Sequence, residues 1–337
     1  MAQQKEFRVA IAGCGGIAQV HSLALASMPG VKVVACADIV LSRAQEMAQR
    51  HGAHAYDSVE AMLAAEEIDS MHICTPHPLH TPLAQLAARK GINIFTEKPP
   101  VVTAAQWEEF AALEKDGARV GVCFQNRYNG SVQCMKELLA SGRLGKVLGA
   151  RAFVTWKRLA PYYTESPWRG SWTTEGGGVL INQSIHTLDL LVYLLGAAQD
   201  VSCTMRNHSL KGAMEVEDTV EAYISFADDV HALFYATNAY CTDAPVSVDI
   251  VCENAQLHMV QNDLTIAWAD GRIEQPTFTE TEALGKGYWG NGHYGCIADF
   301  YAALREGRPY QNDIASVKDT MALMLRMYEP YTGATID

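Results

Sequence analysis

The chain has 337 residues, a formal net charge of −12 and nine cysteines. This length exceeds what one hydrophobic core usually serves, so we expect two domains. With 49% hydrophobic and 19% charged residues, the chain has the balance of a globular protein, and no segment reaches the roughly 20 apolar residues that span a bilayer. These values exclude a membrane-spanning protein, and an acidic balance without Lys/Arg clusters argues against nucleic acid as a partner.

The cysteines and the N-terminus both indicate a reducing compartment. The cysteines are odd in number and include no C-x-x-C pair, which fits free thiols better than a disulfide framework. The polar start, residues 1–7, runs directly into an apolar stretch without the parts of a signal peptide. We therefore expect a cytoplasmic protein.

Short apolar runs alternate with amphipathic stretches from residue 7 to about residue 125. This is the pattern of βαβ units around a parallel sheet. Five runs lack the alternation of a half-exposed strand and are predicted to be buried strands: 7–12, 31–37, 70–74, 92–96 and 119–123. Residues 1–125 are thus predicted to form an α/β domain, a doubly wound dinucleotide-binding Rossmann fold.

The pattern changes after residue 125, and we expect residues 126–337 to form an α+β domain for substrate binding and oligomerisation. Predicted helices are 131–141, 179–195, 297–305 and 315–328. Predicted strands are 147–158, 200–208, 216–227, 230–239, 246–252, 256–261 and 264–269, with turn-prone connections that describe an antiparallel meander. Residues 285–294 are predicted to be a lid or a surface loop.

A glycine-rich turn follows the first predicted strand. Gly13, Gly15 and Gly16, followed by Ile17 and Ala18, make a G-x-G-x-x-A motif between a strand and a helix. The first glycine allows the tight turn, the second lets the backbone approach a pyrophosphate, and the alanine lets helix and strand pack closely. The phosphates would face the N-terminus of the helix.

A carboxylate ends the second predicted strand. Asp38 follows the motif's alanine by twenty residues (38 minus 18), the spacing of the ribose-binding acid in dinucleotide sites. A carboxylate there accepts hydrogen bonds from the adenosine ribose and repels a 2′-phosphate, so the sequence favours NAD over NADP. Arg43 lies close enough to keep NADP open as an alternative.

Three further stretches complete a family pattern. They are Thr75-Pro76-His77-Pro78-Leu79-His80, Glu97-Lys98-Pro99, and the triplet 176–178 of glycines that leads to His186 and Asp189. Together they resemble the glucose-fructose oxidoreductase, inositol dehydrogenase and MocA (Gfo/Idh/MocA) family over essentially the whole chain. The resemblance implies an NAD(P)-dependent enzyme that transfers a hydride between the nicotinamide and a secondary alcohol of a sugar, sugar derivative or cyclitol.

The resemblance also implies roles for the catalytic residues. It places Lys98 beside the nicotinamide and the reacting carbinol, in agreement with its position after a strand, and in the family the bond to Pro99 is often cis. The family's D-x-x-x-H motif matches Asn182 and His186, four residues apart and expected on one helical face. His186 is the expected general base, and Asn182, which cannot share the proton, is expected to orient the substrate.

The remaining candidates line the two ligands. The resemblance places Thr75, Pro76 and His80 along the cofactor near its nicotinamide, with Glu97 and Gln125 nearby. The expected substrate contacts in the second domain are Arg127, Trp168 and Arg169, together with Tyr163 and Trp172, although packing explains each of them as well. Tyr288, His293 and Tyr294 are weaker candidates. No metal is expected, because His77 and His80 lack a third ligand.

Two other functions stay open at this point. One is an enzyme that uses tightly held NAD transiently, for elimination or glycoside cleavage of a sugar, and the other is a non-catalytic NAD-binding regulator. The intact Glu97-Lys98-Pro99 triplet and His186 argue against the regulator. Family relatives commonly pair through the exposed face of the second domain's sheet, so a homodimer or homotetramer is expected.

Overall fold

The structure, a computed structural model, describes residues 6–278, 292–332 and 336. The chain divides into two compact units, which we describe one at a time. The first unit contains residues 1–125 and 293–317, and the second contains residues 126–292 and 318–337. Compared with the division expected from sequence, 293–317 has moved to the N-terminal unit. No helix in the described part of the chain is long and apolar enough to cross a membrane.

The first unit contains a six-stranded parallel sheet. Its strand order is β3-β2-β1-β4-β5-β6, which is the order of a doubly wound dinucleotide-binding fold and confirms the predicted Rossmann domain. The strands are β1 Phe7–Ala12, β2 Val31–Ala37, β3 His54–Tyr56, β4 Ser70–Ile73, β5 Asn93–Thr96 and β6 Val120–Val122. The sequence analysis missed β3, because its three partly exposed residues make no apolar run.

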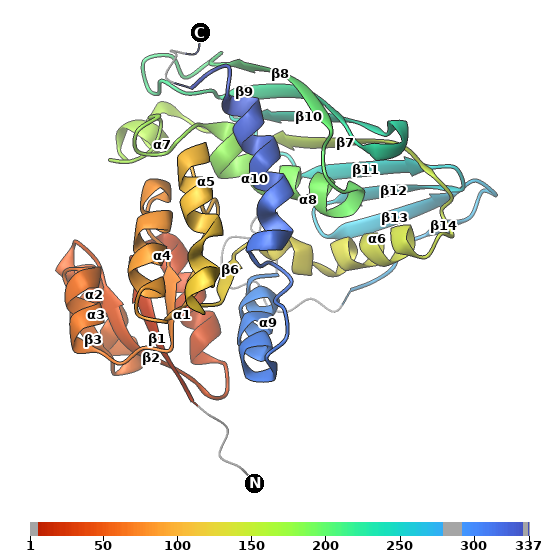
Figure 1. The fold of residues 1–337 in the computed structure, drawn as a ribbon. Coiled ribbons are helices and arrows are strands. Elements are labelled where there is room, and N and C mark those ends of the chain that lie inside the picture. The colour runs from red at the N-terminus through yellow and green to blue at the C-terminus, as the bar shows by residue number, and fades with distance from the viewer. Residues whose placement is uncertain (1–5, 279–291, 333–335, 337) are drawn as a thin grey trace. The chain divides into compact units, whose positions relative to one another are not determined.

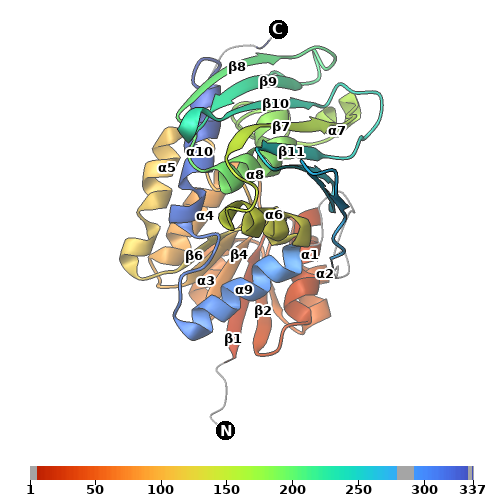
Figure 2. The same ribbon diagram turned by 90° about the vertical axis from the view of Figure 1, so that its right-hand side faces the viewer.

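Helices cover both faces of this sheet (Figures 1 and 2). They are α1 Gly16–Ala26, α2 Leu41–His51, α3 Val59–Ala65, α4 His80–Ala88, α5 Ala104–Ala111 and α9 Gly292–Glu306, with 3₁₀ turns η1 His77–Leu79, η2 Leu113–Asp116 and η3 Gln125–Tyr128. Side chains of α1 and α9 meet the same strand, β4, because His21 and Tyr301 both contact His72. The late helix α9 therefore shares a sheet face with the first helix of the chain.

Aromatic packing explains why residues 293–317 belong to the first unit. The rings of Phe95 in β5 and Phe300 in α9 lie 5.2 Å apart, and Tyr310 lies 5.4 Å from Phe300. Gly121 in β6 makes room for these rings, because a Cβ atom there would lie 2.8 Å from both Phe300 and Tyr310. Burial of three rings is worth several kcal/mol, which no local sequence pattern reveals.

The second unit contains an eight-stranded, mostly antiparallel sheet in the order β14-β13-β12-β11-β7-β10-β9-β8. The strands are β7 Val147–Thr155, β8 Asp200–Arg206, β9 Thr219–Ser225, β10 His231–Thr237, β11 Ser247–Cys252, β12 Ala255–Val260, β13 Asp263–Trp268 and β14 Ile273–Glu274. The predicted meander is wrong at one place: β7 lies between β10 and β11, parallel to the first and antiparallel to the second. Turn signals cannot show such a strand insertion, because its pairing partners are distant in the chain.

Helices pack on one face of this sheet, as Figure 1 shows for α6 and α8. The helical segments are α6 Gly130–Ala140, α7 Ala160–Thr164, η4 Leu180–Ser184, α8 Ile185–Leu195 and α10 Ile314–Tyr328. The helix predicted over 179–195 is not α-helical throughout, because η4 is a π-helical turn. The opposite sheet face carries exposed apolar side chains, among them Tyr223, Leu233 and Val251.

The packing around Gly121 gives a stability prediction. Gly121→Ala places a methyl group against Phe95, Phe300 and Tyr310, and the overpacking should lower the free energy of unfolding by about 1–3 kcal/mol. Urea unfolding of the apo protein measures the change. Gly16→Ala is the matched control, since its methyl group meets no described atom within 4 Å. Equal stability of both variants would contradict the packing described here.

Candidate functional site

The glycine turn after β1 has the geometry that a phosphate-binding turn requires. Gly13 has a φ of +84°, and a Cβ atom there would lie 2.7 Å from the carbonyl oxygen of Cys74, so no other residue fits. Around Gly15 and Gly16 an added Cβ atom meets no described atom within 4 Å. No side chain of the described residues caps α1, so its first amides can bind an anion.

Asp38 braces this turn from the end of β2. Its Oδ2 accepts a hydrogen bond from the Cys14 amide at 2.8 Å, and its Oδ1 accepts one from the Val40 amide at 2.8 Å. A carboxylate has about four acceptor positions, so two stay available for ribose hydroxyls. Arg43 is exposed on α2.

The loop after β4 contributes a buried hydroxyl to the same sheet edge. Thr75 packs against Gly13, and its Oγ1 is buried without a hydrogen-bond partner among the described residues. Buried hydroxyls are normally satisfied, so this atom points to a ligand that supplies the missing bond. Pro76 continues the loop into η1. The open glycine turn, the uncapped helix and this hydroxyl fit a dinucleotide.

His80 connects the loops that follow β4 and β5. It is fully buried, and its Nδ1 and Nε2 lie 2.7 Å from the Pro99 carbonyl and 2.8 Å from the Thr75 carbonyl. Burial lowers the pKa of this imidazole, against the two carbonyl contacts that raise it. Its place between two backbone carbonyls gives His80 a role in positioning both loops.

The triplet Glu97-Lys98-Pro99 follows β5, with a cis peptide bond between Lys98 and Pro99. The Glu97 carboxylate accepts a hydrogen bond from the Lys98 amide at 3.2 Å and lies 3.0 Å from His21 Nε2. Burial would raise the pKa of Glu97, but the hydrogen bond from His21 and the nearby Lys98 charge outweigh it and lower the pKa. Glu97 is therefore ionised beside Lys98, which is partly exposed.

His293 in α9 belongs to this group, although the sequence gave it little weight. It is 4% exposed, and burial lowers its pKa to about 4. Lys98, Glu97 and His21 all influence its charge. Gln125, at the end of the first unit, is also buried, with its Oε1 4.0 Å from the Cys123 thiol.

In the second unit, burial distinguishes Asn182 and His186 from their neighbours. Every residue from 175 to 192 is buried except these two, which are partly exposed. Asn182 lies in the π-helical turn and His186 in the first turn of α8. The helix thus offers two polar side chains four residues apart on an otherwise apolar segment.

Glu175, which the sequence analysis missed, holds Asn182. The Asn182 side-chain amide donates a hydrogen bond to Glu175 Oε1, and the Gly170 amide donates to Oε2 at 2.5 Å. Burial raises the pKa of this carboxyl group to about 7. This hydrogen bond fixes the orientation of the Asn182 side chain. No motif marks Glu175, apart from its place directly before the glycine triplet.

A second buried carboxylate explains the glycine triplet. Glu217 accepts hydrogen bonds from the amides of Gly178 and Leu180 at 3.0 Å and from the Tyr328 hydroxyl at 2.6 Å. A Cβ atom at Gly178 would lie 1.9 Å from the Glu217 carbonyl oxygen, and one at Gly177 would lie 2.3 Å from the Tyr328 hydroxyl. Only glycines let the backbone approach closely enough to make these bonds.

Arg127, one of the predicted substrate contacts, pairs with a carboxylate of the second unit. It is 1% exposed, and its guanidinium donates two hydrogen bonds to Asp189, at 2.8 and 2.5 Å. Thr320 also donates to Asp189 at 2.7 Å. We therefore propose a structural role for Arg127 instead of substrate contact.

Trp168 and Arg169 remain candidates for substrate contact. Both are partly exposed, and the Arg169 guanidinium stacks 4.2 Å above the Tyr162 ring and 4.9 Å from Trp168. Tyr163 is buried, and its hydroxyl accepts a hydrogen bond from Asn238 at 2.8 Å. Trp172 packs edge-on against Tyr328. Tyr288 lies outside the described residues.

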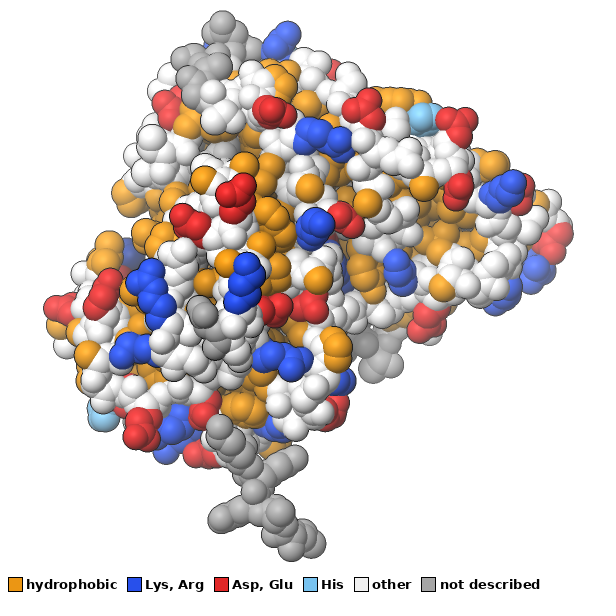
Figure 3. Space-filling view, in the orientation of Figure 1, with side chains coloured by type: hydrophobic (Ala, Val, Ile, Leu, Met, Phe, Trp, Pro, Cys, Tyr) orange, Lys and Arg blue, Asp and Glu red, His pale blue; other side chains and the backbone are white. Residues whose placement is uncertain are grey.

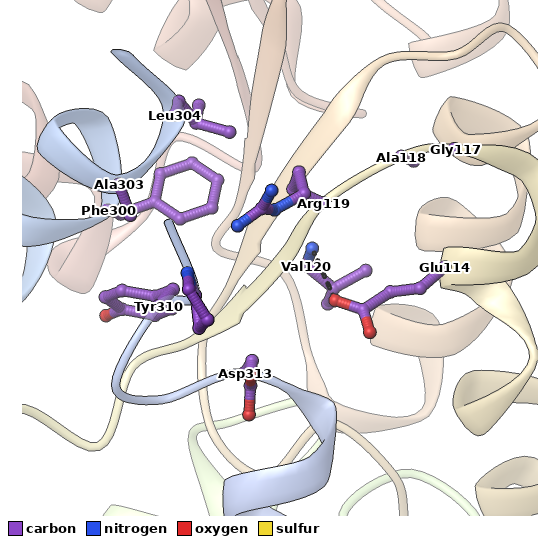
Figure 4. Close-up of a pocket in the computed structure, with 11 residues that line it drawn as sticks. Glu114, Gly117, Ala118, Arg119, Val120, Phe300, Ala303, Leu304, Tyr310 and Asp313 are labelled. Atoms are coloured by element: carbon purple, nitrogen blue, oxygen red, sulfur yellow. Dashed lines mark hydrogen bonds between the residues drawn. The ribbon is translucent and has the colours of Figure 1, made fainter. Parts of the chain in front are cut away.

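A cavity of about 330 Å³ lies in the first unit (Figure 4). Arg119, Phe300 and Tyr310 are among its lining residues. It adjoins the start of β6, whereas open parallel sheets bind ligands outside the carboxyl ends of their strands. We therefore do not place the dinucleotide there.

Charges of both signs are interspersed on the face of the protein shown in Figure 3. A nucleic acid or an anionic surface binds to concentrated positive charge, which that face does not offer in its described part.

Comparisons with known proteins identify the class that this fold and site define. Residues 7–124 match the family model described as "Oxidoreductase family, NAD-binding Rossmann fold", and residues 132–258 match the model of the GFO/IDH/MocA C-terminal domain. The chain belongs to the Gfo/Idh/MocA oxidoreductase family, as its motifs indicated. Its N-terminal unit is an NAD-binding domain of that family.

Individual relatives give a more specific picture. D-glucoside 3-dehydrogenase of Escherichia coli (strain K12) is 33% identical over 195 residues, which are 56% of this chain and 54% of the relative. The scyllo-inositol 2-dehydrogenase (NAD(+)) of Bacillus subtilis (strain 168) is 30% identical over 199 residues, 58% and 55% of the two chains. Each alignment spans just over half the length of the relative.

A solved structure resembles the whole chain. The WlbA dehydrogenase from Bordetella pertussis, in complex with NADH and UDP-GlcNAcA, is 26% identical with a TM-score of 0.83 and coverage of 96% of both chains. This similarity agrees with the two sheets described above.

Asp38 gives a prediction for cofactor binding. Asp38→Asn removes the charge that braces the Cys14 amide and is expected to bind ribose, so the affinity for NAD should fall about tenfold or more, with a smaller loss for NADP. Fluorescence titration with each dinucleotide measures both affinities. Asp57→Asn, at an exposed site after β3, is the matched control. Unchanged NAD affinity in the Asp38 variant would contradict this role.

Glu175 gives a prediction for stability as a function of pH. Because its pKa rises from about 4.5 to about 7 on folding, the stability it contributes is complete below about pH 4.5 and is lost as the pH rises to about 7. The wild type should lose up to about 3 kcal/mol relative to Glu175→Gln over this range. Urea unfolding at several pH values measures it, with Glu165→Gln at an exposed site as the control. A constant difference between wild type and Glu175→Gln would show that Glu175 does not titrate there.

Proposed function

We propose that this protein is an NAD-dependent dehydrogenase or reductase that acts on a secondary alcohol of a sugar, sugar derivative or cyclitol. One observation carries the proposal: the open glycine turn, the unpartnered Thr75 hydroxyl and the Glu97-Lys98-Pro99 triplet all follow the carboxyl ends of strands in one parallel sheet. That edge is where such sheets bind dinucleotides. NAD, when bound, accepts or donates the hydride.

The cofactor is held by backbone and side chains of the first unit. The proposed contacts are Gly13, Gly15, Gly16, Ile17, Ala18, Asp38, Thr75, Pro76, Glu97, Lys98 and Gln125, with His80 behind the loops. The α1 amides bind the pyrophosphate, and Asp38 binds the adenosine ribose. The braced carboxylate favours NAD, while the exposed Arg43 leaves room for NADP.

The proton and the substrate oxygen are handled by two side chains. Lys98 polarises the carbinol oxygen and stabilises the negative charge that develops there. His186 accepts the hydroxyl proton in oxidation and returns it in reduction. Asn182 cannot take the proton, but its side-chain amide, which Glu175 holds in place, can hydrogen-bond a substrate hydroxyl.

The substrate class follows from the relatives and from the second unit. The relatives named above are dehydrogenases of a glucoside and of an inositol. Trp168 and Arg169 offer a ring face and a guanidinium suited to the apolar faces and hydroxyl groups of a polyhydroxylated ring. Which ring is bound depends on a few hydroxyl contacts.

The assembly and location complete the proposal. The exposed apolar side chains on the outer face of the eight-stranded sheet support a homodimer or homotetramer that pairs through this face. All nine cysteines are free thiols, which supports a cytoplasmic location.

Substitution of the two catalytic residues tests the mechanism. Lys98→Met and His186→Ala should each lower turnover by more than about tenfold, about 1.4 kcal/mol of barrier. NADH absorbance during a screen of monosaccharides, sugar acids and inositols measures turnover and also distinguishes net oxidation from transient use of NAD. Lys90→Met and His208→Ala change exposed residues of the same types and serve as controls. Turnover within tenfold of wild type would remove these roles.

A further inference from the structure

A chain of buried hydrogen-bonding side chains lies behind Glu97. The Glu97 carboxylate lies 3.0 Å from His21 Nε2, and His21 Nδ1 lies 2.8 Å from His72 Nδ1. His72 Nε2 lies 2.9 Å from the Tyr301 hydroxyl, which lies 2.8 Å from the Ser70 hydroxyl. Glu97 is 6% exposed and the other four at most 1%. Five polar residues are thus joined in one line by direct side-chain contacts.

The hydrogen-bonded chain runs from the carboxyl ends of the parallel strands to their amino ends. Glu97 follows the carboxyl end of β5, whereas Ser70 is the first residue of β4. The line passes along the sheet face that α1 and α9 cover, with His21 on the first helix and Tyr301 on the second (Figure 2). One end of the hydrogen-bonded chain therefore lies next to Lys98, and the other lies at the amino end of β4.

The chemistry of these groups fixes the direction of every hydrogen bond. An ionised carboxylate only accepts, so His21 Nε2 donates to Glu97. When His21 is neutral, its Nδ1 accepts from His72 Nδ1, and His72 Nε2 accepts from Tyr301. The Tyr301 oxygen then accepts from the hydroxyl of Ser70. All bonds point towards Glu97, and His72 is the Nδ1–H tautomer.

Protonation of His21 reverses this direction without loss of a bond. His21 Nδ1 then donates to His72 Nδ1, His72 Nε2 donates to Tyr301, and Tyr301 donates to Ser70. An extra proton inside a protein normally leaves a donor unpaired, at a cost of about 1–3 kcal/mol. This chain avoids that cost because each inner member can both donate and accept.

Titratable groups from several elements face His21. They are Glu97 after β5, His72 in β4, His293 in α9 and Cys123 after β6. Burial lowers the pKa of His72 and His293 and raises that of the Cys123 thiol, so these three are uncharged at neutral pH. The ionised Glu97, with Lys98 beside it, is the charge to which a proton on His21 responds.

We propose that His21 is a proton store for the cofactor site. His21 gains a proton when NADH replaces NAD⁺, because the positive charge near Lys98 then falls by one. His72 and Tyr301 are positioning residues that reverse their hydrogen bonds to admit that proton. Only N–H and O–H bonds change, and the proton is taken up from solvent, since the hydroxyl proton of the carbinol goes to His186. The inference rests on the proposed function, because it requires the nicotinamide to lie beside Lys98.

Ligand atoms of His21, Glu97 and Cys123 also lie within 4.8 Å of one another, which is a spacing that a metal site has. Both ring nitrogens of His21 are already hydrogen-bonded, however, so the arrangement is that of a hydrogen-bonded chain. Metal analysis of the purified protein separates the two: a stoichiometric divalent ion lost in His21→Gln would overturn the proton store.

The first experiment uses ¹⁵N NMR of the histidine rings in the protein without cofactor. His72 should be the neutral Nδ1–H tautomer at neutral pH, and His21 should carry its proton on Nε2. A His72 proton on Nε2 while His21 is neutral would overturn the proposal. This readout is independent of turnover.

The second experiment measures the affinities for NAD⁺ and NADH between about pH 6 and pH 8.5. Because NADH favours a protonated His21, the ratio of its Kd to that of NAD⁺ should rise with pH, by about threefold or more. In His72→Phe the ratio should vary by less than about twofold, since the Nδ1–H of a charged His21 then has no acceptor. Tyr301→Phe takes the place of the His72 variant if that variant fails to fold. It removes one hydroxyl of the hydrogen-bonded chain and should weaken the pH dependence of the ratio.

Tyr310→Phe is the matched control, because this buried hydroxyl donates to the Cys296 carbonyl at 3.0 Å, outside the chain. It should keep the wild-type pH dependence. A wild-type ratio that is independent of pH, or an equal dependence in the wild type and His72→Phe, would overturn the proton store while both cofactors still bind. Failure to bind either cofactor would instead contradict the proposed function.

Discussion

The contact between Gly13 and the carbonyl of Cys74 is the constraint on which the cofactor edge depends. No methyl group fits between them, so the chain turns sharply after β1 and enters α1 with its first amides directed outward. The same contact brings Thr75 against the turn, and Asp38 fixes the turn from the other side through Cys14. The carboxyl ends of β1, β2 and β4 are thereby held together, and the E-K-P triplet follows the carboxyl end of β5.

Buried carboxylates hold parts of both units in place, and each carboxylate binds different partners. Glu97 is ionised because His21 donates a hydrogen bond to it and the positive charge of Lys98 lies close by. Glu217 binds the backbone of the glycine triplet, while Glu175 binds Asn182. Burying a carboxylate costs several kcal/mol unless it is well paired, so these groups stabilise specific geometry more than they stabilise the fold. The helix with His186 is positioned in this way.

The sequence predicted features that depend on neighbours in the chain. Apolar runs gave the bounds of β1 and β2 correctly, and the glycine turn, E-K-P triplet and glycine triplet identified the family. It could not predict the return of α9 to the first sheet or the insertion of β7 between β10 and β11, because both depend on contacts between distant residues. Glu175 and the His21–His72–Tyr301 chain were missed for the same reason: no spacing rule joins such residues. Nor could the sequence predict that Arg127, a candidate for substrate contact, pairs with Asp189, which lies 62 positions away in the chain.

Hydrogen exchange with and without NADH tests the central claim most directly, namely that the dinucleotide binds at the carboxyl edge of the first sheet. The account predicts slower exchange in residues 13–18 and in the loops 75–80 and 97–99, with no change around the cavity near residues 119–120 and 303–310. Protection confined to that cavity, or none in the glycine turn at saturating NADH, would contradict it.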